Sequence, residues 1–559
     1  MKSAGTETAA TSRNRSHTLH RCAAGGFVIL WAAALTPLAW WGLPSSADDR
    51  LLFAGGERWP AERFAAARAA ESRRRATTAT DVDIDPLPQS DELIDLTADD
   101  AKRAAILRRF RLYSRQPDEM LTFMALQRMR PRAGDLDPGF YQYGGAYIYL
   151  IGASLGVGDL IGFSPISTDI DVYMVNPERF ARFYIAARLI SLAFACAALL
   201  GVFALAGRAA GRRAGWIAMW LLACAPAFLT ASLEAKPHIA ASAMTIWTIW
   251  AAMKYLQVGG RSWAVMGLTA GAAVSILLAG AAALAVLPAV LLVRRDRRTL
   301  SHVLGAAAIA LAVFALTNPY LLHHALFRRE LLANNFGNTL AMYRVGSLAG
   351  SVAALAVFLQ LSLGPTWWLA PLGVRRLRRR WGGRILLPAA PAAALLAVFG
   401  MVAAGKPAEF ARFLLTLCAL LCIAGGVVGA GWVRASRRVG IAAIAALVVL
   451  EGGAAYVANF AQDAHHKYET RRTAAVDLLE TANRQDAIGV VAEPAPYSCP
   501  PLDFARRRVV LLPSAAPATA GRPADLPEWI VACADRTDAF DRMWWRPLYA
   551  VWRTYGDEW

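Results

Sequence analysis

The sequence predicts a mainly α-helical, polytopic membrane protein with about eleven transmembrane helices and a small C-terminal α/β domain. Of its 559 residues, 56% are hydrophobic and only 18% are charged, a balance too apolar for an ordinary soluble protein. Apolar runs of about twenty residues, long enough to cross a bilayer as helices, recur from residue 25 to residue 460. After residue 460 the apolar runs shorten and alternate with polar sequence, which is typical of a soluble domain.

The first apolar run follows a polar, basic tail at residues 1–24, which we expect in the cytoplasm. Residues 25–44 are long enough to form the first transmembrane helix of a domain that extends over residues 25–460. A cleaved signal peptide is the alternative, because the small and polar residues SSADD follow. Both interpretations place the next region outside the cytoplasm.

The first outer loop, residues 45–180, is polar and contains stretches of helix-forming composition. We expect surface helices here, with Lys and Arg side chains near lipid phosphates. An apolar stretch at residues 143–163 is rich in Gly and interrupted by Asp159. It either spans the membrane or lies in the interface as a re-entrant segment, and the positions of the charges favour the interfacial segment.

The later apolar runs are separated by basic clusters. These runs are residues 187–207, 216–231, 239–256, 263–293 (a tight hairpin), 302–316, 348–372, 385–404, 413–433 and 440–460. If residues 143–163 do not span, the clusters GRAAGRR, GGR, RRDRR, RRLRRRWGGR and RASRR all fall on the side of the basic N-terminus. That side is the cytoplasm by the positive-inside rule, which also accounts for the net charge of +18 without a nucleic-acid partner.

The C-terminal region, residues 461–559, then faces the periplasm or the cell exterior. One stretch there has helix-forming composition, and AIGVVAE, RRVVLLP and EWIVACAD are short apolar runs typical of buried strands. Cys499 and Cys533 both lie in this region, and whether they pair is left open. No Gly-rich phosphate loop is evident in it.

Two adjacent carboxylates, Asp118 and Glu119, are the first candidates for chemistry on the outer side. Adjacent carboxylates are also common on solvated surfaces. Asp118 follows Pro117, so we expect it to open a helix whose N-terminus favours its charge.

The segment SLEAKPH lies where one apolar run ends and the next begins. It contains Glu234, Lys236 and His238, and a continuing helix would place Glu234 and His238 on one face. Ionisable residues at such a boundary line a cavity when they point inward. The alternative is that Lys236 only reaches toward lipid head groups.

Two later outer segments add further candidates. Asn318 and Tyr320 lie in NPYLLHH, whose two adjacent histidines do not share a helix face and so do not form a zinc motif. A helix on the membrane surface is the alternative interpretation of this segment. Arg412 precedes a late apolar run, where it would bind a phosphate or meet lipid head groups.

A carboxylate pair and several cations at helix ends suit a reaction in which an acceptor is deprotonated while a phosphate leaves. The order of features resembles the GT-C integral membrane glycosyltransferases, in particular the branch of protein O-mannosyltransferases and lipid A aminoarabinose transferases. The features are PDE, FYQYGGAYIYL, AARLISLAFACAALLG, SLEAKPH, TNPYLL and EFARFLL, within about residues 110–435.

The resemblance implies a polyprenyl-phosphate-linked sugar donor, a lipid, glycan or protein acceptor, and inverting transfer at the outer face of a bacterial inner (plasma) membrane. Asp118, with Glu119 beside it, would be the catalytic acidic residue. The resemblance also implies sites for the donor and its pocket. The donor-binding candidates are Arg188, Lys236, His238 and Arg412, and the further pocket candidates are Tyr143, Glu234, Asn318 and Tyr320.

Two departures from the family pattern stand out. The family often has Asp where this chain has His238, and a neutral imidazole is not a permanent anion. The stretch that follows Tyr143 lacks the family's prolines. The sequence indicates no cofactor and no metal ligand set, and a divalent metal ion is left open.

Two other functions remain open. A transporter or flippase of a lipid-linked sugar would place ionisable residues near the bilayer midplane and would show repeated halves. No repeat is evident, and most charges lie at loop mouths. A non-catalytic GT-C-like scaffold would bind its lipid without turnover.

Overall fold

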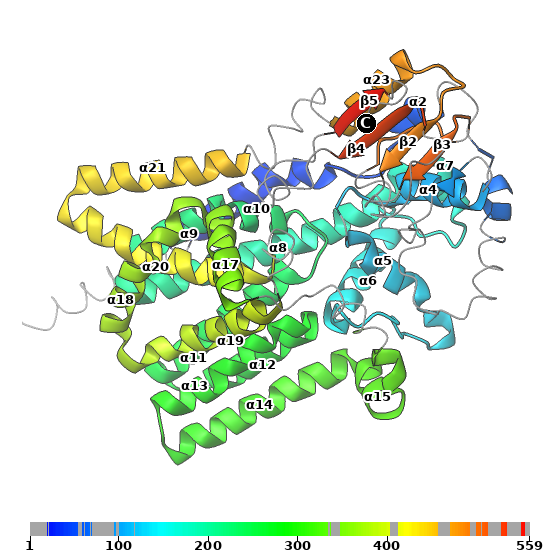
Figure 1. Ribbon diagram of the computed structural model, residues 1–559. Coiled ribbons are helices and arrows are strands. Elements are labelled where there is room, and N and C mark those ends of the chain that lie inside the picture. Colours follow the sequence, from blue (N-terminus) through cyan, green and yellow to red (C-terminus); the bar gives the residue numbers. More distant parts are fainter. Residues whose placement is uncertain are drawn as a thin grey trace, which may run out of the picture. The chain divides into compact units, whose positions relative to one another are not determined.

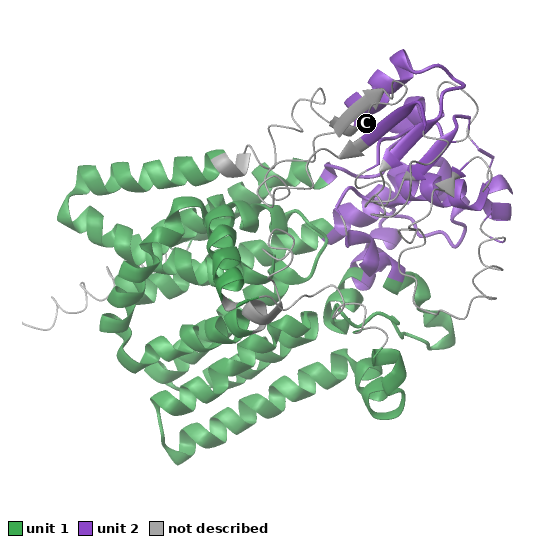
Figure 2. Ribbon diagram, viewed as in Figure 1, with its two compact units in different colours: residues 1–39, 125–151, 188–456 green, residues 40–124, 152–187, 457–559 purple. Residues whose placement is uncertain are grey.

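The computed structural model forms two compact units, which Figure 2 shows in green and purple. The first unit comprises residues 1–39, 125–151 and 188–456, and the second comprises residues 40–124, 152–187 and 457–559. The described residues are 20, 22–53, 59–60, 62–67, 69, 94–96, 100–116, 118–333, 336, 347–402, 412–456, 470–491, 499–504, 506–512, 527–533 and 549–553. The chain passes from one unit to the other within helices α5 (Glu119–Arg128), α6 (Gly145–Leu160) and α8 (Pro177–Ala210).

The first unit is mainly helical (Figure 1). It begins with the helical stretch Cys22–Trp40, which ends in η1 (Thr36–Trp40), and η4 (Pro131–Ala133) follows α5. After α8 come α9 (Arg212–Cys224), α10 (Pro226–Ser232), α11 (His238–Val258), α12 (Ser262–Ile276), η5 (Leu278–Ala285), α13 (Val286–Val293), α14 (Arg297–Thr317) and α15 (Pro319–Phe327). The remaining elements are α17 (Leu348–Leu363), η6 (Gly364–Leu369), α18 (Ala370–Trp381), η7 (Gly382–Ile385), α19 (Leu386–Val402), α20 (Leu415–Ala435) and α21 (Arg437–Tyr456).

Small residues allow the helices of this unit to pack closely. A Cβ at Gly271 of α12 would lie 2.8 Å from the Cα of Ala310 in α14. A Cβ at Gly426 of α20 would lie 2.6 Å from the carbonyl oxygen of Ala214 in α9. Membrane helices usually associate through small side chains that let their backbones approach closely. In lipid there is no hydrophobic driving force between helices, so close packing has to supply the attraction.

Five described helical stretches are long and apolar enough to cross a membrane. They are Cys22–Trp40, Pro177–Ala210, Arg297–Thr317, Ala349–Ala397 and Arg412–Ala435. A sixth results if α9 and α10, which bend by 69° where they meet, count as one broken span. The expected number of about eleven is not confirmed, because several expected spans are shorter helices, including both halves of the expected hairpin at residues 263–293.

Helix α6 occupies most of the apolar stretch at residues 143–163. Its 16 residues rise about 24 Å, which is less than the ~30 Å of a bilayer's hydrocarbon core. This length agrees with an interfacial position, which stays a prediction.

The second unit contains a five-stranded sheet flanked by helices. Its elements are η2 (Ser46–Asp48), α2 (Asp49–Leu52), β1 (Ile94–Asp95), α4 (Asp100–Leu112), α7 (Asp171–Val175), α23 (Thr470–Thr481), β2 (Ile488–Val491), β3 (Val509–Leu512), β4 (Trp529–Cys533) and β5 (Tyr549–Arg553). The strand order is β1-β3-β2-β4-β5. Strand β2 runs parallel to β3 and β4, whereas the two outer strands pair antiparallel.

The first outer loop and the C-terminal region share the core of this unit. Phe110 of α4 stacks on Phe504 with the ring centroids 5.9 Å apart, and Ile94 of β1 pairs with Leu511 of β3. The C-terminal strands therefore do not bury their apolar side chains alone. The boundary at residue 461 and the pairing of Cys499 with Cys533 stay predictions, and the side chain of Cys533 lies outside the described residues.

Candidate functional site

The entrance of helix α11 gathers the candidate residues of the first unit. Helix α9 ends at Cys224, and Pro226 begins the short helix α10, which ends at Ser232. A turn then leads to Pro237, which is the N-cap of α11 and forms no side-chain cap. The N-terminus of a helix carries partial positive charge and unpaired backbone N–H groups, so this entrance is suited to an anion.

His238, the first residue of α11, is packed between two aromatic rings. Its ring lies edge to face with Phe413, at 4.7 Å between centroids, and with Tyr143, at 6.2 Å. The side chain is only 3% exposed, and neither ring nitrogen has a hydrogen-bond partner within the described part of the chain. A buried polar group without a partner is destabilising, and a ligand that bonded to the ring nitrogens of His238 would satisfy them.

Lys236 and Glu234 form a buried ion pair beside His238. The Nζ of Lys236 lies 3.2 Å from the Oε2 of Glu234. Lys236 is 5% exposed, so it does not reach outward to lipid head groups, and that alternative is wrong. Glu234 lies in the turn between α10 and α11, so the continuing helix that would align it with His238 does not form.

Arg412 belongs to the same group through its neighbour. Its guanidinium carbon lies 5.7 Å from the centre of the Phe413 ring, which in turn contacts His238. The positive charges of Arg412 and Lys236 both act on the imidazole of His238. We name Lys236, His238, Arg412 and the helix end they surround the α11 cation group. The sequence signal for Arg412 was its position directly before a late apolar run.

Tyr143 is brought to this group by backbone contacts that the sequence did not predict. It forms an isolated antiparallel bridge with Leu277, and the N–H of Gly144 donates to the carbonyl oxygen of Ile276 at 3.0 Å. Gly144 packs against the backbone of residue 275 so closely that a Cβ would clash with it. Tyr143 is therefore held rigidly beside His238.

Asn318 and Tyr320 hold this loop, which is a different role from the expected one of lining a pocket. The Oδ1 of Asn318 accepts a hydrogen bond from the N–H of Gly145 at 2.7 Å. The hydroxyl of Tyr320 accepts one from the N–H of Leu136 at 3.0 Å. Both residues therefore anchor the chain before and after Tyr143.

Arg188 makes a structural contact. It lies in α8, is 1% exposed, and its Nη1 donates to the carbonyl oxygen of Ala39 at 3.0 Å. This hydrogen bond ties α8 to the N-terminal helix and does not join Arg188 to the α11 cation group.

The two acidic candidates lie in the second unit. Glu119 is the first residue of α5, is fully buried, and accepts a hydrogen bond from the hydroxyl of Ser114. Asp118 immediately precedes the helix, and its carbonyl oxygen accepts from the N–H of Leu121 at 3.3 Å. The backbone of Asp118 has φ +71°, and among the described residues no other non-glycine residue has a positive φ. A strained backbone of this kind is concentrated at functional sites, so Asp118 is the better catalytic candidate and Glu119 is its support.

Six of the candidate residues lie within a segment that matches a family model, whereas Tyr143 and Arg412 lie outside it. Residues 182–323 match the model of the dolichyl-phosphate-mannose-protein mannosyltransferase family, a GT-C family. The resemblance to the GT-C membrane glycosyltransferases is confirmed. The matched GT-C segment contains Arg188, Glu234, Lys236, His238, Asn318 and Tyr320.

Several solved structures are similar to the chain. ArnT from Cupriavidus metallidurans bound to undecaprenyl phosphate is 13% identical with a TM-score of 0.46, over 80% of this chain and 96% of that one. The apo state of that protein is 13% identical with a TM-score of 0.45, over 77% and 91%. The archaeal oligosaccharyltransferase AglB from Archaeoglobus fulgidus, in complex with an inhibitory peptide and a dolichol-phosphate, is 15% identical with a TM-score of 0.39, over 74% and 61%.

The search of curated proteins found no match to the chain. The apolar helices and the GT-C segment together identify a multi-pass membrane protein.

Proposed function

We propose that this protein is an inverting membrane glycosyltransferase. It transfers a sugar from a polyprenyl-phosphate-linked donor to a lipid, glycan or protein acceptor at the outer face of a bacterial inner membrane. The observation that carries this proposal is His238 at the start of α11, a buried imidazole on which Lys236 and Arg412 act and whose two nitrogens have no hydrogen-bond partner among the described residues.

The α11 cation group suits the phosphate of the donor. Lys236 supplies a point charge and Arg412 a planar pair of donors, and the end of α11 adds backbone N–H groups. Each of these stabilises the negative charge that develops on the phosphate as the sugar leaves. The matched family model is described as acting with dolichyl-phosphate-mannose, which supports a donor of this chemical class.

His238 adds no negative charge to this group. An Asp at the same position would cancel one of the two neighbouring cations, whereas an imidazole is neutral or positive. Its N–H would donate to a phosphate oxygen or to a sugar hydroxyl, and its other nitrogen would accept from a sugar hydroxyl. Either bond would satisfy an atom that has no partner among the described residues.

Asp118 is the general base in this proposal. Its carboxylate takes the proton of the acceptor's hydroxyl or amine, the acceptor atom forms a bond to the anomeric carbon, and the bond from that carbon to the phosphate oxygen breaks. The polyprenyl phosphate leaves with the electron pair, and the configuration at the anomeric carbon inverts. Glu119 supports the turn that carries Asp118 through its hydrogen bond with Ser114.

The test is transfer of labelled sugar from polyprenyl-phosphate donors in proteoliposomes. Asp118→Asn is the decisive variant, because Asn tolerates a positive φ and the fold should be unchanged. We expect a loss of about two or more orders of magnitude, as for removal of a general base. Asp159→Asn, which changes a carboxylate elsewhere in the first outer loop, is the matched control. Equal turnover in wild type and Asp118→Asn would remove Asp118 from the mechanism.

Transport of a lipid-linked sugar is the second candidate, and two observations favour it. Helices α9 and α10 form a broken pair, bent by 69°, directly before the α11 cation group, and broken helices carry the binding sites of many transporters. Glu451 of α21 is also fully buried among helices, where ionisable residues often mark pathways. Movement of a labelled lipid-linked sugar across protein-containing vesicles, without turnover, would favour transport. Binding without either activity would favour a scaffold.

A further inference from the structure

A second polar cluster lies in the first unit, away from the residues that the proposed reaction uses. Asp137 accepts hydrogen bonds on both of its carboxylate oxygens. The Nε2 of His324, in α15, lies 2.8 Å from Oδ2, and the hydroxyl of Tyr141 lies 2.5 Å from Oδ1. The backbone N–H of Gly139 also donates to Oδ1 at 3.0 Å.

The cluster is well shielded from water. Tyr141 and His324 are buried, and only a quarter of the Asp137 side chain is exposed. Because an ionised carboxylate only accepts hydrogen bonds, the proton of His324 must lie on Nε2. The rings of Tyr141 and His324 also meet edge to face at 5.5 Å. Two buried donors therefore hold the carboxylate of Asp137. Hydrogen bonds to an ionised carboxylate are stronger than those between neutral groups.

This cluster fixes one end of the segment that carries Tyr143. We name residues 135–145 the outer strap. At its first end, Asp137 is joined to His324, and Leu136 is joined to Tyr320. Both of those partners lie in α15, so a single helix holds this end of the outer strap.

The other end of the outer strap is fixed separately. Gly144 is bonded to the carbonyl oxygen of Ile276, and Gly145 is bonded to the side chain of Asn318, the N-cap of α15. Tyr143 lies between the two fixed ends, and its ring packs on Phe140 at 5.3 Å and on His238 at 6.2 Å. Any movement of the strap therefore moves the ring that covers His238.

We propose that Asp137, Tyr141 and His324 form a clasp that positions Tyr143 over the α11 cation group. None of the three is assigned to the reaction itself, and they are positioning residues. The clasp keeps Tyr143 in place so that the pocket around His238 is already formed when the phosphate arrives. This inference rests on the proposed function, because it assigns the phosphate of the donor to the α11 cation group.

The experiment has two readouts on the full-length protein in nanodiscs. The first is hydrogen–deuterium exchange of the peptides that cover the outer strap, because exchange rates report local opening. The second is the Kd of polyprenyl phosphate. The variants are His324→Ala, Asp137→Asn, the double variant and His324→Gln, which keeps an N–H donor. His323→Ala, which changes an exposed histidine of the same helix, is the matched control.

The clasp predicts at least tenfold faster exchange of the amides of Leu136 and Gly139, at the clasped end of the outer strap, in His324→Ala and Asp137→Asn, and at least a fivefold higher Kd. The double variant should stay below the product of the two single variants and close to His324→Ala, which already removes the bond between residues 137 and 324. His324→Gln should recover part of both effects, and His323→Ala should match the wild type. Peptides of α14 should exchange as in the wild type in every variant.

Three results would overturn the proposal. The first is unchanged exchange of the outer strap in His324→Ala and Asp137→Asn, which would mean that the clasp does not hold the strap. The second is faster exchange with an unchanged Kd, which would mean that the strap does not position the phosphate pocket. The third is that the two single variants act independently, so that their increases in exchange rate and in Kd multiply in the double variant. Failure of the wild type to bind polyprenyl phosphate would instead contradict the proposed function, while the exchange rates would still show whether the clasp exists.

Discussion

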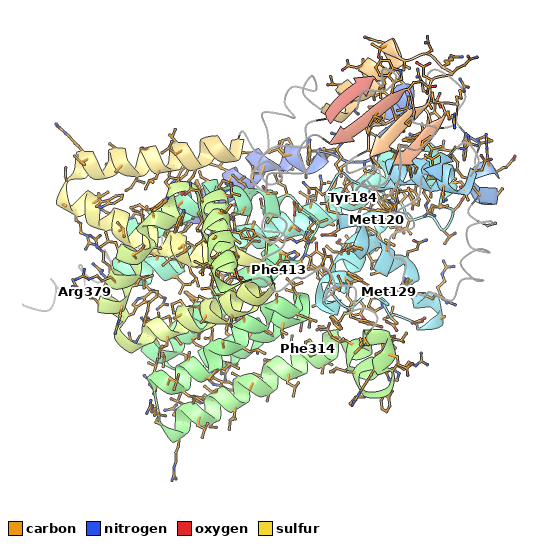
Figure 3. All side chains as sticks on the ribbon, in the orientation of Figure 1. Met120, Met129, Tyr184, Phe314, Arg379 and Phe413 are labelled. Carbon is orange, nitrogen blue, oxygen red and sulfur yellow. The ribbon has the colours of Figure 1, made fainter. Side chains whose placement is uncertain are left out.

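The ring of Phe413 lies edge to face on the imidazole of His238, with 4.7 Å between their centroids. This contact joins the start of α20 to the start of α11, so two helix entrances meet at one buried histidine. The positive charges of Arg412 and Lys236, which are far apart in the sequence, both act on the imidazole of His238. Figure 3 shows Phe413 among the helices of the first unit and Arg379, from the basic cluster of α18, at a distant edge of that unit.

Replacing His238 tests whether the α11 cation group needs an uncharged or positive residue. In His238→Asp a carboxylate would face Lys236 and Arg412 and would repel a phosphate. We expect at least tenfold weaker binding of polyprenyl phosphate than in His238→Asn, equivalent to about 1.4 kcal/mol. Titration of the purified protein with polyprenyl phosphate measures this difference. Equal affinities of the two variants would show that the phosphate does not lie beside His238.

The strained backbone of Asp118 predicts opposite effects of two substitutions on stability. Asp118→Ala places a Cβ in the left-handed region without a polar side chain, and we expect a loss of about 1 kcal/mol. Asp118→Gly removes the steric conflict and should leave the protein at least as stable as the wild type. Thermal unfolding in detergent measures both, and sugar transfer should be lost in both. Transfer at the wild-type rate in Asp118→Gly would show that the carboxylate of Asp118 takes no part in the reaction.

The close packing of α12 on α14 predicts a large effect of a small change. Gly271→Val would force a side chain into a space where even a Cβ lies 2.8 Å from the Cα of Ala310. We expect destabilisation of about 1–3 kcal/mol, as is usual for overpacking.

Gly207→Ala is the matched control for this change, because nothing lies within 4 Å of a Cβ at that helical position. That variant should gain about 0.5–1 kcal/mol. The midpoint of thermal unfolding ranks the two variants against the wild type. A tolerated Gly271→Val would contradict the packing of these helices.

The clasp predicts how stability depends on pH. Burial alone would raise the pKa of Asp137, but the hydrogen bonds from Tyr141 and His324 outweigh it and hold that pKa below its usual value. Because the pKa of Asp137 is lower in the folded protein than in the unfolded chain, its ionised carboxylate stabilises the fold. This stabilisation is fully present above the pKa of Asp in the unfolded chain, about 3.9, and is lost as the pH falls through the pKa in the folded protein. The advantage of the wild type over Asp137→Asn should therefore shrink on acidification below about pH 4.

Unfolding midpoints measured from neutral pH to acid check this prediction. His323→Ala again serves as the control and should show no such change. If the wild type unfolds at a higher temperature than Asp137→Asn by the same amount at every pH, Asp137 is not held as an anion.

Part of this structure could be predicted from the sequence for simple physical reasons. Long apolar runs and basic clusters indicate membrane helices, because lipid leaves backbone groups no partners but each other. The turn at SLEAKPH was recognisable because ionisable residues interrupt apolar sequence there. The number of spans was not predictable in the same way. Helices such as α12 are apolar but shorter than the length expected of a helix that crosses the membrane.

The rest depends on contacts between distant segments. Nothing near Ile94 indicates that it pairs with Leu511, and no local pattern links Tyr143 to Leu277. Asn318 was a pocket candidate because of its position, but its side chain is used to hold Gly145. Local sequence therefore identified residues that lie at helix entrances, and only the fold shows which of them hold other segments in place.

The most direct test of the central claim is the affinity for polyprenyl phosphate when Lys236 is removed. Lys236→Met alone would leave Glu234 buried without its partner, so Glu234→Gln is added. Lys254→Met, at the other end of α11, is the control. Our account predicts at least tenfold weaker binding in Glu234→Gln/Lys236→Met than in Glu234→Gln, which leaves the charge of Lys236 unpaired, and wild-type affinity in Lys254→Met. Equal affinities of the double variant and Glu234→Gln would contradict the assignment of the donor phosphate to the α11 cation group.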